Sequence, residues 1–121
     1  MAGKTRQTCP CVSRKAGRRV VYEKQAEILK ALAHPLRVAI LDFLKDGEQC
    51  VCDIAKHVNS ERSNVSRHLA VMVNAGVLES RKQGLNVMYE LKALCILDFF
   101  SCLEKCLKVQ AKDTQKLMKA L

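Results

Sequence analysis

Two short segments of helical periodicity, joined by the tight linker Val58-Asn59-Ser60, constrain the fold of this chain more than any other feature. The first covers Val51 to His57, and the second runs from Ser60, a suitable N-cap, to Asn74. A linker this short holds the two helices together at the spacing of a helix-turn-helix. The apolar residues expected to pack across the pair are Ile54, Ala55, Val58, Val65, Leu69 and Met72.

A β-hairpin is predicted directly after this pair of helices. Gly76 supplies a C-terminal stop for the longer helix. Val77–Arg81 and Asn86–Leu91 are extended runs, and a turn at residues 82–85 separates them. The predicted fold is therefore mainly α with a small β-hairpin, a winged helix-turn-helix.

Two further helices are expected before the helix-turn-helix. The first covers about Tyr22 to Leu32 and should end at His34, because the residue before a proline disfavours helical conformation. Pro35 suits the first turn of the second helix. The residues expected on one face of the first helix are Ala26, Leu29 and Ala33, and those facing inward from the second are Leu36, Ile40, Leu41 and Leu44.

A long helix is predicted from Ala93 to about Leu117, with an apolar stripe that includes Leu94, Leu97 and Leu107. One small domain offers too little partner surface for this stripe and for that of the first helix, so we expect a homodimer through these two helices. Residues 1–19 show no helical periodicity and are predicted to form a flexible basic arm. Residues 20–121 then form one winged helix-turn-helix domain with a terminal dimerisation helix.

The charge balance favours a polyanionic partner. The 121 residues contain 21 Lys and Arg against 12 Asp and Glu, a net charge of +9. A basic domain of this size most often binds nucleic acid.

Cysteine usage depends on the compartment. Met1 to Ser13 is polar and lacks the apolar core of a secretory signal, and the most apolar stretch, Ala93 to Leu103, falls short of the ~20 residues of a membrane span. We therefore expect a cytoplasmic protein that does not bind a membrane. Because cytosolic thiols stay reduced, the seven cysteines favour metal binding or redox chemistry over a disulfide framework.

Three motifs follow one another at Leu32–Leu41 (LAHPLRVAIL), Cys50–Ala55 (CVCDIA) and Asn64–Leu69 (NVSRHL). Together they resemble the ArsR/SmtB family of metal-responsive winged-helix transcriptional repressors, in its arsenic-sensing or cadmium/lead-sensing branch. The resemblance covers about residues 22–110. It implies a homodimer that binds double-stranded operator DNA when metal-free and dissociates when thiolates bind a soft metal, and it implies no enzymatic activity.

The second helix of a helix-turn-helix lies in the major groove with its N-terminal residues at the base edges. Asn pairs bidentately with adenine, and Ser bonds to either base pair. We therefore assign Ser63, Asn64 and Ser66 to bases. Contacts to phosphates are assigned to Arg62, Arg67 and His68 and, from the wing, to Arg81 and Lys82.

Cys50 and Cys52 form a C-x-C pair at the start of a predicted helix, where free amides and the helix dipole favour thiolates. Positions i and i+2 of an α-helix point about 200° apart. Both sulfurs can therefore reach one ion only if the first turn unwinds. This geometry predicts that metal binding distorts the helix that supports the reading helix.

The resemblance indicates where further ligands come from. The arsenic-sensing branch has a third cysteine where this chain has Ala55, whereas the cadmium/lead-sensing branch uses cysteines of an N-terminal arm. The predicted site therefore has three or four thiolates drawn from Cys9, Cys11, Cys50 and Cys52. Thiolates favour soft ions, here As(III), Cd(II), Pb(II) or Zn(II), as the inducer.

Cys95, Cys102 and Cys106 share one face of the last predicted helix and form a second candidate metal or redox site. In family members with zinc on this helix, two histidines occupy the positions of Cys95 and Cys106. The carboxylate partners are replaced by Ala93 and Val109, so a softer thiolate site is one alternative. Packing as small residues in a dimer interface is the other.

Two other functions remain as alternatives. A thiol-redox repressor on the same fold would form a disulfide under oxidant, either among Cys95, Cys102 and Cys106 or between Cys9 and Cys11 of the arm. A thiol oxidoreductase is disfavoured because the sequence has no C-x-x-C redox motif and no phosphate-binding loop.

Overall fold

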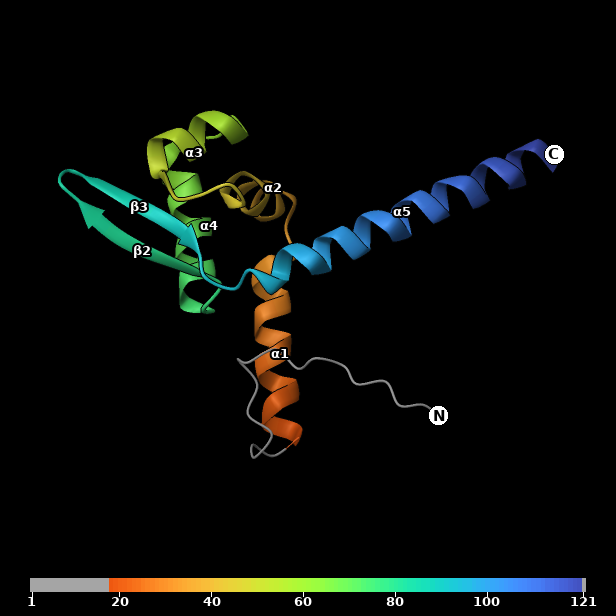
Figure 1. Cartoon of the computed structure of the whole chain (residues 1–121), viewed down its shortest axis with the longest axis horizontal. Helices are drawn as coiled ribbons and strands as arrows, with labels where there is room; N and C mark the ends of the chain where they lie inside the picture. The colour runs from red at the N-terminus through yellow and green to blue at the C-terminus, as the bar shows by residue number, and fades with distance from the viewer. Residues whose placement is uncertain (1–17, 121) are drawn as a thin grey trace.

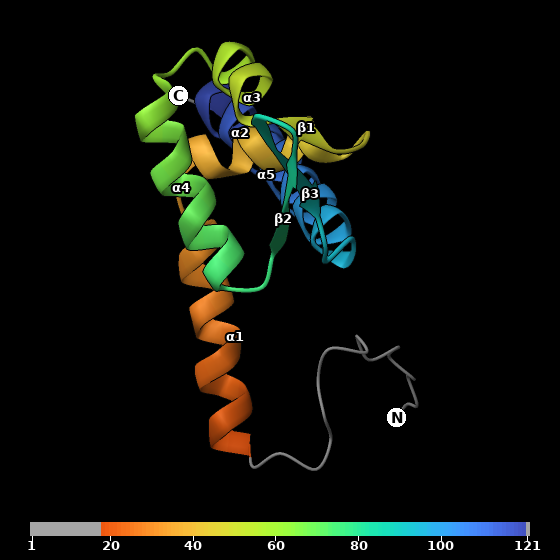
Figure 2. The same cartoon turned by 90° about the vertical axis from the view of Figure 1, so that its left-hand side faces the viewer.

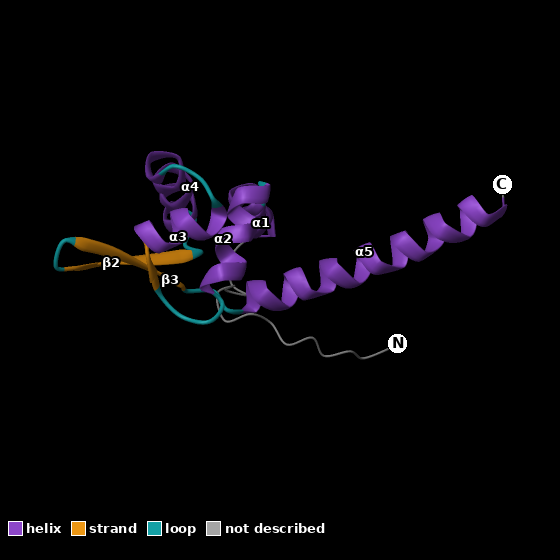
Figure 3. Cartoon of the chain, turned by 90° about the horizontal axis from the view of Figure 1, so that it is seen from above, coloured by secondary structure: helices purple, strands orange, loops and turns teal. Residues whose placement is uncertain are grey.

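The computed structural model describes residues 18–120, so the part of the predicted arm at residues 1–17, with Cys9 and Cys11, lies outside the described residues. Helices α2–α4 form a body from which α1 projects, and the hairpin and α5 extend from it on opposite sides (Figures 1 and 3). The elements are α1 (Arg18–Leu32), α2 (Pro35–Leu44), β1 (Gln49–Cys50), α3 (Val51–Val58), α4 (Arg62–Asn74), β2 (Leu78–Gln83), β3 (Asn86–Leu91) and α5 (Cys95–Ala120).

The core lies where α2, α3 and α4 meet the base of the hairpin. All six apolar residues predicted to pack across the helix-turn-helix belong to it, with Val58 at its partly buried edge. The four inward residues predicted for α2 are also confirmed, and Leu36 is the least buried of them. Fully buried side chains of this cluster include Ile40, Leu41, Ile54, Val65, Leu69 and Met72.

Helix α1 is longer than predicted. It begins at Arg18, four residues before Tyr22. The face predicted to carry Ala26, Leu29 and Ala33 is uncovered in the single chain, because Ala26 and Ala33 are exposed and Leu29 is 51% exposed. Burial is confined to the last turn, at Ala31 and Leu32, because α1 touches the body only where it meets α2 and α4. Ile28 is partly buried against the core, whereas Val20 and Tyr22 are exposed.

The turn between α3 and α4 uses a different cap from the predicted one. Asn59 adopts the left-handed conformation, with φ of 53°, and ends α3. Helix α4 begins at Arg62 after Glu61 as its N-cap, so the prediction that Ser60 is the cap is wrong. The left-handed residue turns the chain one step earlier than a simple Ser cap would, which frees the Ser60 hydroxyl to accept a hydrogen bond from Asn64.

The predicted stop at Gly76 is confirmed. Gly76 has φ of 82°, and its N–H donates to the Val73 carbonyl at 3.0 Å. The next N–H, of Val77, donates to the Met72 carbonyl at 3.0 Å. This pair of bonds is a Schellman motif, which needs a residue that tolerates positive φ. It directs the chain from α4 into β2, beside which α4 lies (Figure 2).

The hairpin is confirmed and has a third strand that the sequence did not predict. Gly84 and Leu85 form a two-residue turn in which Gly84 has φ of 65°, as a tight hairpin requires at that position. The short strand β1 pairs antiparallel with β3, giving the order β1-β3-β2. Cys50 therefore lies at the end of a strand and precedes α3.

Helix α5 is continuous over 26 residues and contacts the body only near its start. Ile96 is its buried residue, whereas Leu107 is 62% exposed and every residue from Ser101 to Ala120 is exposed. Within residues 18–120, no helix is long and apolar enough to cross a membrane.

The core predicts a large difference between two leucine substitutions. Leu69 is fully buried and Leu85 is fully exposed at the wing tip. Leu69→Ala should lower the free energy of unfolding by about 2–5 kcal/mol, because it removes buried methyl groups and leaves a cavity. Leu85→Ala should change it by less than about 0.5 kcal/mol. Urea unfolding at one fixed protein concentration measures both, and equal losses would contradict this core.

Candidate nucleic-acid interface and thiol sites

The N-terminal half of α4 presents a basic, hydrogen-bonding surface. Arg62, Ser63, Ser66 and Arg67 are exposed there, and the first turn carries no acidic residue. Free N–H groups at a helix start add positive potential. These four predicted contacts therefore lie where a major groove can reach them.

Asn64, predicted to read a base, already has partners within the protein. Its Nδ2 donates to the Ser60 hydroxyl at 3.0 Å, and its Oδ1 accepts from an Nη of Arg67 at 3.2 Å. Each atom is used only once, so a second N–H and a second lone pair remain for a bidentate contact to adenine. The bonds to Ser60 and Arg67 fix the orientation of the amide, and Asn64 is half-buried at the start of the helix.

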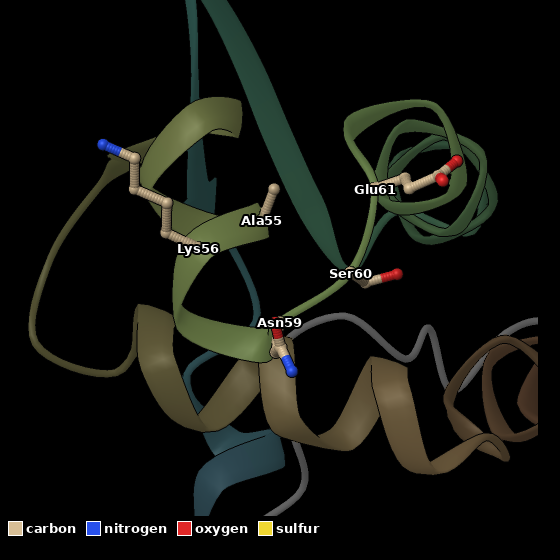
Figure 4. Close-up of a pocket in the computed structure, with 5 residues that line it drawn as sticks. All are labelled: Ala55, Lys56, Asn59, Ser60 and Glu61. Carbon is tan, nitrogen blue, oxygen red and sulfur yellow. The ribbon is translucent and has the colours of Figure 1, made fainter.

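A shallow depression of about 570 Å³ lies at the turn between α3 and α4 (Figure 4). It is wide open and adjoins the reading helix, so it extends that surface and does not enclose a small ligand. Its lining residues are Ala55, Lys56, Asn59, Ser60 and Glu61.

His68, which is predicted to touch phosphate, lies at the junction of three helices. Its Nδ1 accepts from Nε of Arg37 at 3.0 Å, and its ring centroid is 4.5 Å from that of His34. Arg37 also donates to the carbonyls of Lys30 and Ala31 at the end of α1. Burial, and then the neighbouring charges, lower the pKa of His68. A neutral ring that accepts from arginine is suited to joining α1, α2 and α4, and it brings no positive charge to DNA.

The two predicted wing contacts have different surroundings. Lys82 is exposed on β2. Arg81 forms an ion pair with Glu48, a residue just before β1, and its guanidinium also donates to the side chain of Gln83 at 3.4 Å. Only Lys82 is therefore immediately available to a phosphate.

Cys50 and Cys52 lie at the joint between the sheet and the helix-turn-helix. Cys50 is the extended N-cap of α3, with φ of −83° and ψ of 160°, and Cys52 is in the first turn. Both thiols are half-buried and reduced. The expectation that two helical cysteines must point about 200° apart is wrong, because pairing of β1 with β3 keeps Cys50 out of the helix. Unwinding of α3 is therefore not a precondition for both sulfurs to reach one ion.

Two thiolates suit a soft ion in their chemistry but are too few for a complete site, since structural zinc takes four ligands. In the range 18–120, no three His, Cys, Asp or Glu side chains come together as a group that could hold a metal. Further donors would come from outside that range or from a second copy of the chain.

The cysteines of α5 do not converge either. Cys95 and Cys102 are seven residues apart, a rise of about 10 Å along a helix. Cys102 and Cys106 are neighbours one turn apart, and all three residues are exposed. The described chain thus offers a pair of thiols here, not a three-ligand site.

Comparison with known proteins indicates the family to which this chain is similar. Residues 34–80 match the family model for bacterial regulatory proteins of the arsR family. The chain is 37% identical over 70 residues to the arsenical resistance operon repressor of Staphylococcus xylosus, covering 58% of this chain and 67% of the relative. It is 40% identical over 67 residues to the cadmium resistance transcriptional regulatory protein CadC homolog of Staphylococcus aureus. That match covers 54% of this chain and 55% of the relative.

The fold also matches a homodimeric winged helix-turn-helix DNA-binding domain from Mycobacterium bovis, with a TM-score of 0.70 and 23% identity over 84% of this chain and 95% of that one. The fold and the basic end of α4 thus define a winged helix-turn-helix DNA-binding regulator. Within that class, the chain belongs to the ArsR family, as its sequence motifs indicated. This is a family of transcriptional regulators and not of enzymes.

Two residues that make contacts in this region were not identified from the sequence. Arg37 gave no local signal, because its partner His68 is 31 positions away. Glu48 gave no signal, because its role requires the unpredicted pairing of β1.

The contact between Arg37 and His68 predicts a loss of stability in mild acid. The pKa of His68 is lowered from 6.5 in the folded protein, so the folded state binds fewer protons than the unfolded state. Its contribution is complete above pH 6.5 and is lost as pH falls through the lowered folded pKa. We expect the urea midpoint to fall between about pH 7.5 and about pH 5.5, and to fall less in His68→Gln, whose amide oxygen still accepts from Arg37 but does not titrate.

His57 provides the control, since its ring stacks on Phe43 with centroids 4.0 Å apart. In His57→Gln the urea midpoint should fall in acid by as much as it does in the wild type. If His68→Gln and His57→Gln behaved alike, the assignment to His68 would be wrong.

Proposed function

We propose that this repressor binds a palindromic operator as a metal-free homodimer and is released when its thiolates bind a soft metal or metalloid. The observation that carries the proposal is the position of Cys50 and Cys52. One ends a strand paired with the wing, and the other begins the helix that supports α4. A ligand that draws these thiols together therefore acts on both DNA-binding elements.

As(III), Cd(II), Pb(II) and Zn(II) are the proposed inducers, because thiolates bind these ions in preference to hard cations. The similarity to an arsenical resistance operon repressor and to a cadmium resistance regulator supports the first two. Cys9 and Cys11, on the proposed arm before α1, would supply the donors that the described residues lack. Cys95, Cys102 and Cys106 form a second proposed site.

The homodimer is supported by the apolar residues of α1 and α5 that face solvent in the single chain. Leu29 is 51% exposed, and Leu94 and Leu107 are 63% and 62% exposed. The similar domain from Mycobacterium bovis is homodimeric. A dimer would give the two reading helices the two-fold arrangement that a palindrome requires.

A thiol-redox repressor is the second candidate, favoured by the exposed thiols of Cys102 and Cys106 one helical turn apart. Free-thiol titration after peroxide, compared with operator binding in the same samples, separates it from metal response. Loss of thiols together with loss of operator binding would favour the redox mechanism.

The proposed surface predicts distinct effects of two α4 variants. Arg67→Ala should weaken binding to all duplexes alike and lower the slope of log K against log salt by about 0.9. Asn64→Ala should relax preference at one base position, a discrimination of about 1–3 kcal/mol. Fluorescence anisotropy with operator and random duplexes measures both, and equal binding of wild type to the two duplexes would contradict operator recognition.

The proposed thiol site predicts which cysteines are needed for release. Cys50→Ser and Cys52→Ser should bind the operator as the wild type does but no longer be released by Cd(II), Pb(II) or As(III). Cys9→Ser and Cys11→Ser should weaken metal binding and reduce release. Thiolate-to-metal absorbance and anisotropy report the two steps, whose coupling is typically about 1–3 kcal/mol.

The α5 cysteines provide the control. If α5 serves only as a dimer interface, replacing Cys95, Cys102 and Cys106 together by Ser should leave release by Cd(II) intact. If this triple variant lost release while Cys50→Ser kept it, the regulatory site would belong to α5.

A further inference from the structure

Cys50 and Arg81 occupy one row across the three-stranded sheet. Met88 of β3 is paired with Cys50 on one side and with Arg81 on the other. Directly paired residues of antiparallel strands project to the same face. The segment that ends at Cys50 and the arginine of the wing therefore share a sheet face.

Glu48 lies two residues before Cys50 and forms an ion pair with Arg81 across that face. The residues are 33 positions apart, whereas the other ion pairs in the described part of the chain join residues three or four positions apart. The Glu48 side chain is 32% exposed, against 63–70% for the other paired carboxylates. This pair is thus a tertiary contact and not a local one.

Arg81 has one charge and two candidate partners. A guanidinium binds carboxylate and phosphate oxygens with the same donor geometry, so it cannot serve both fully at once. Its side chain is 55% exposed and can therefore be reached by a DNA backbone. Exposed ion pairs contribute about 0–1 kcal/mol, so exchanging one partner for another costs little.

We propose that Glu48 competes with the DNA backbone for Arg81 and so sets how strongly the wing binds DNA. The proposal rests on the proposed placement of Arg81 in the DNA-binding surface and is independent of metal response. Because Glu48 and Cys50 belong to one short segment, the competition also provides a route by which thiol chemistry would change DNA affinity.

A double-mutant cycle tests this competition. The full chain, metal-free, is titrated with a random-sequence duplex in four forms, namely wild type, E48Q, R81Q and E48Q/R81Q. E48Q should tighten binding by about two- to fivefold, the factor that corresponds to an exposed ion pair. In the R81Q background, E48Q should produce only the change that follows from removing one negative charge.

Glu79 provides the matched control, because it is an exposed carboxylate on β2 and calibrates that general charge effect. E48Q should tighten DNA binding by a larger factor than E79Q does when Arg81 is present. In the R81Q background the two substitutions should tighten binding by the same factor. If E48Q and E79Q tightened DNA binding equally in both backgrounds, or if E48Q had the larger effect in both, the proposed competition would be wrong. Urea midpoints of all variants verify that each is folded.

The R81Q arm separates two kinds of failure. If R81Q weakens DNA binding equally with and without E48Q, Arg81 belongs to the DNA-binding surface but Glu48 does not restrain it. If R81Q leaves DNA binding unchanged in both backgrounds, the proposed placement of Arg81 is wrong and the competition falls with it.

Discussion

The burial of one apolar seam between α3 and α4 is the constraint on which the rest of this structure depends. Ile54 from α3 and Val65 and Leu69 from α4 are fully buried against α2. A domain of this size has one modest core, so these side chains supply a large share of its stabilisation. The seam fixes which face of α4 is buried and leaves its polar face at the surface, where the proposed DNA contacts lie.

Elements attached to this seam differ in how firmly they are held. The hairpin continues directly from the Schellman motif at Gly76, and Leu78 and Leu91 at its base belong to the core. Helices α1 and α5 join the body through short buried stretches and leave most of their apolar residues outside. This contrast is consistent with a reading unit that is complete within one chain and an association surface that is completed by a second chain.

Polar contacts connect the DNA-reading parts to the rest of the body. Arg37 joins the end of α1 to His68 on α4, and Glu48 joins the segment before α3 to Arg81 on the wing. Each contact bridges elements whose relative position matters for binding a duplex. Cys50, two residues after Glu48, lies in this same region, which makes it a physically sensible place for a ligand to alter DNA affinity.

The sequence by itself determined the order of the helices and the hairpin and the core of the helix-turn-helix, and it nominated the residues at the start of α4 as DNA contacts. These follow from local rules, namely apolar periodicity, the proline at residue 35 and the glycine at residue 76. Tertiary structure decided what depends on residues distant in the chain. Strand β1 is two residues long and exists only through its bonds to β3, and those bonds keep Cys50 out of α3. The partners of His68 and Arg81 are 31 and 33 positions away, so no local pattern of the sequence could assign them.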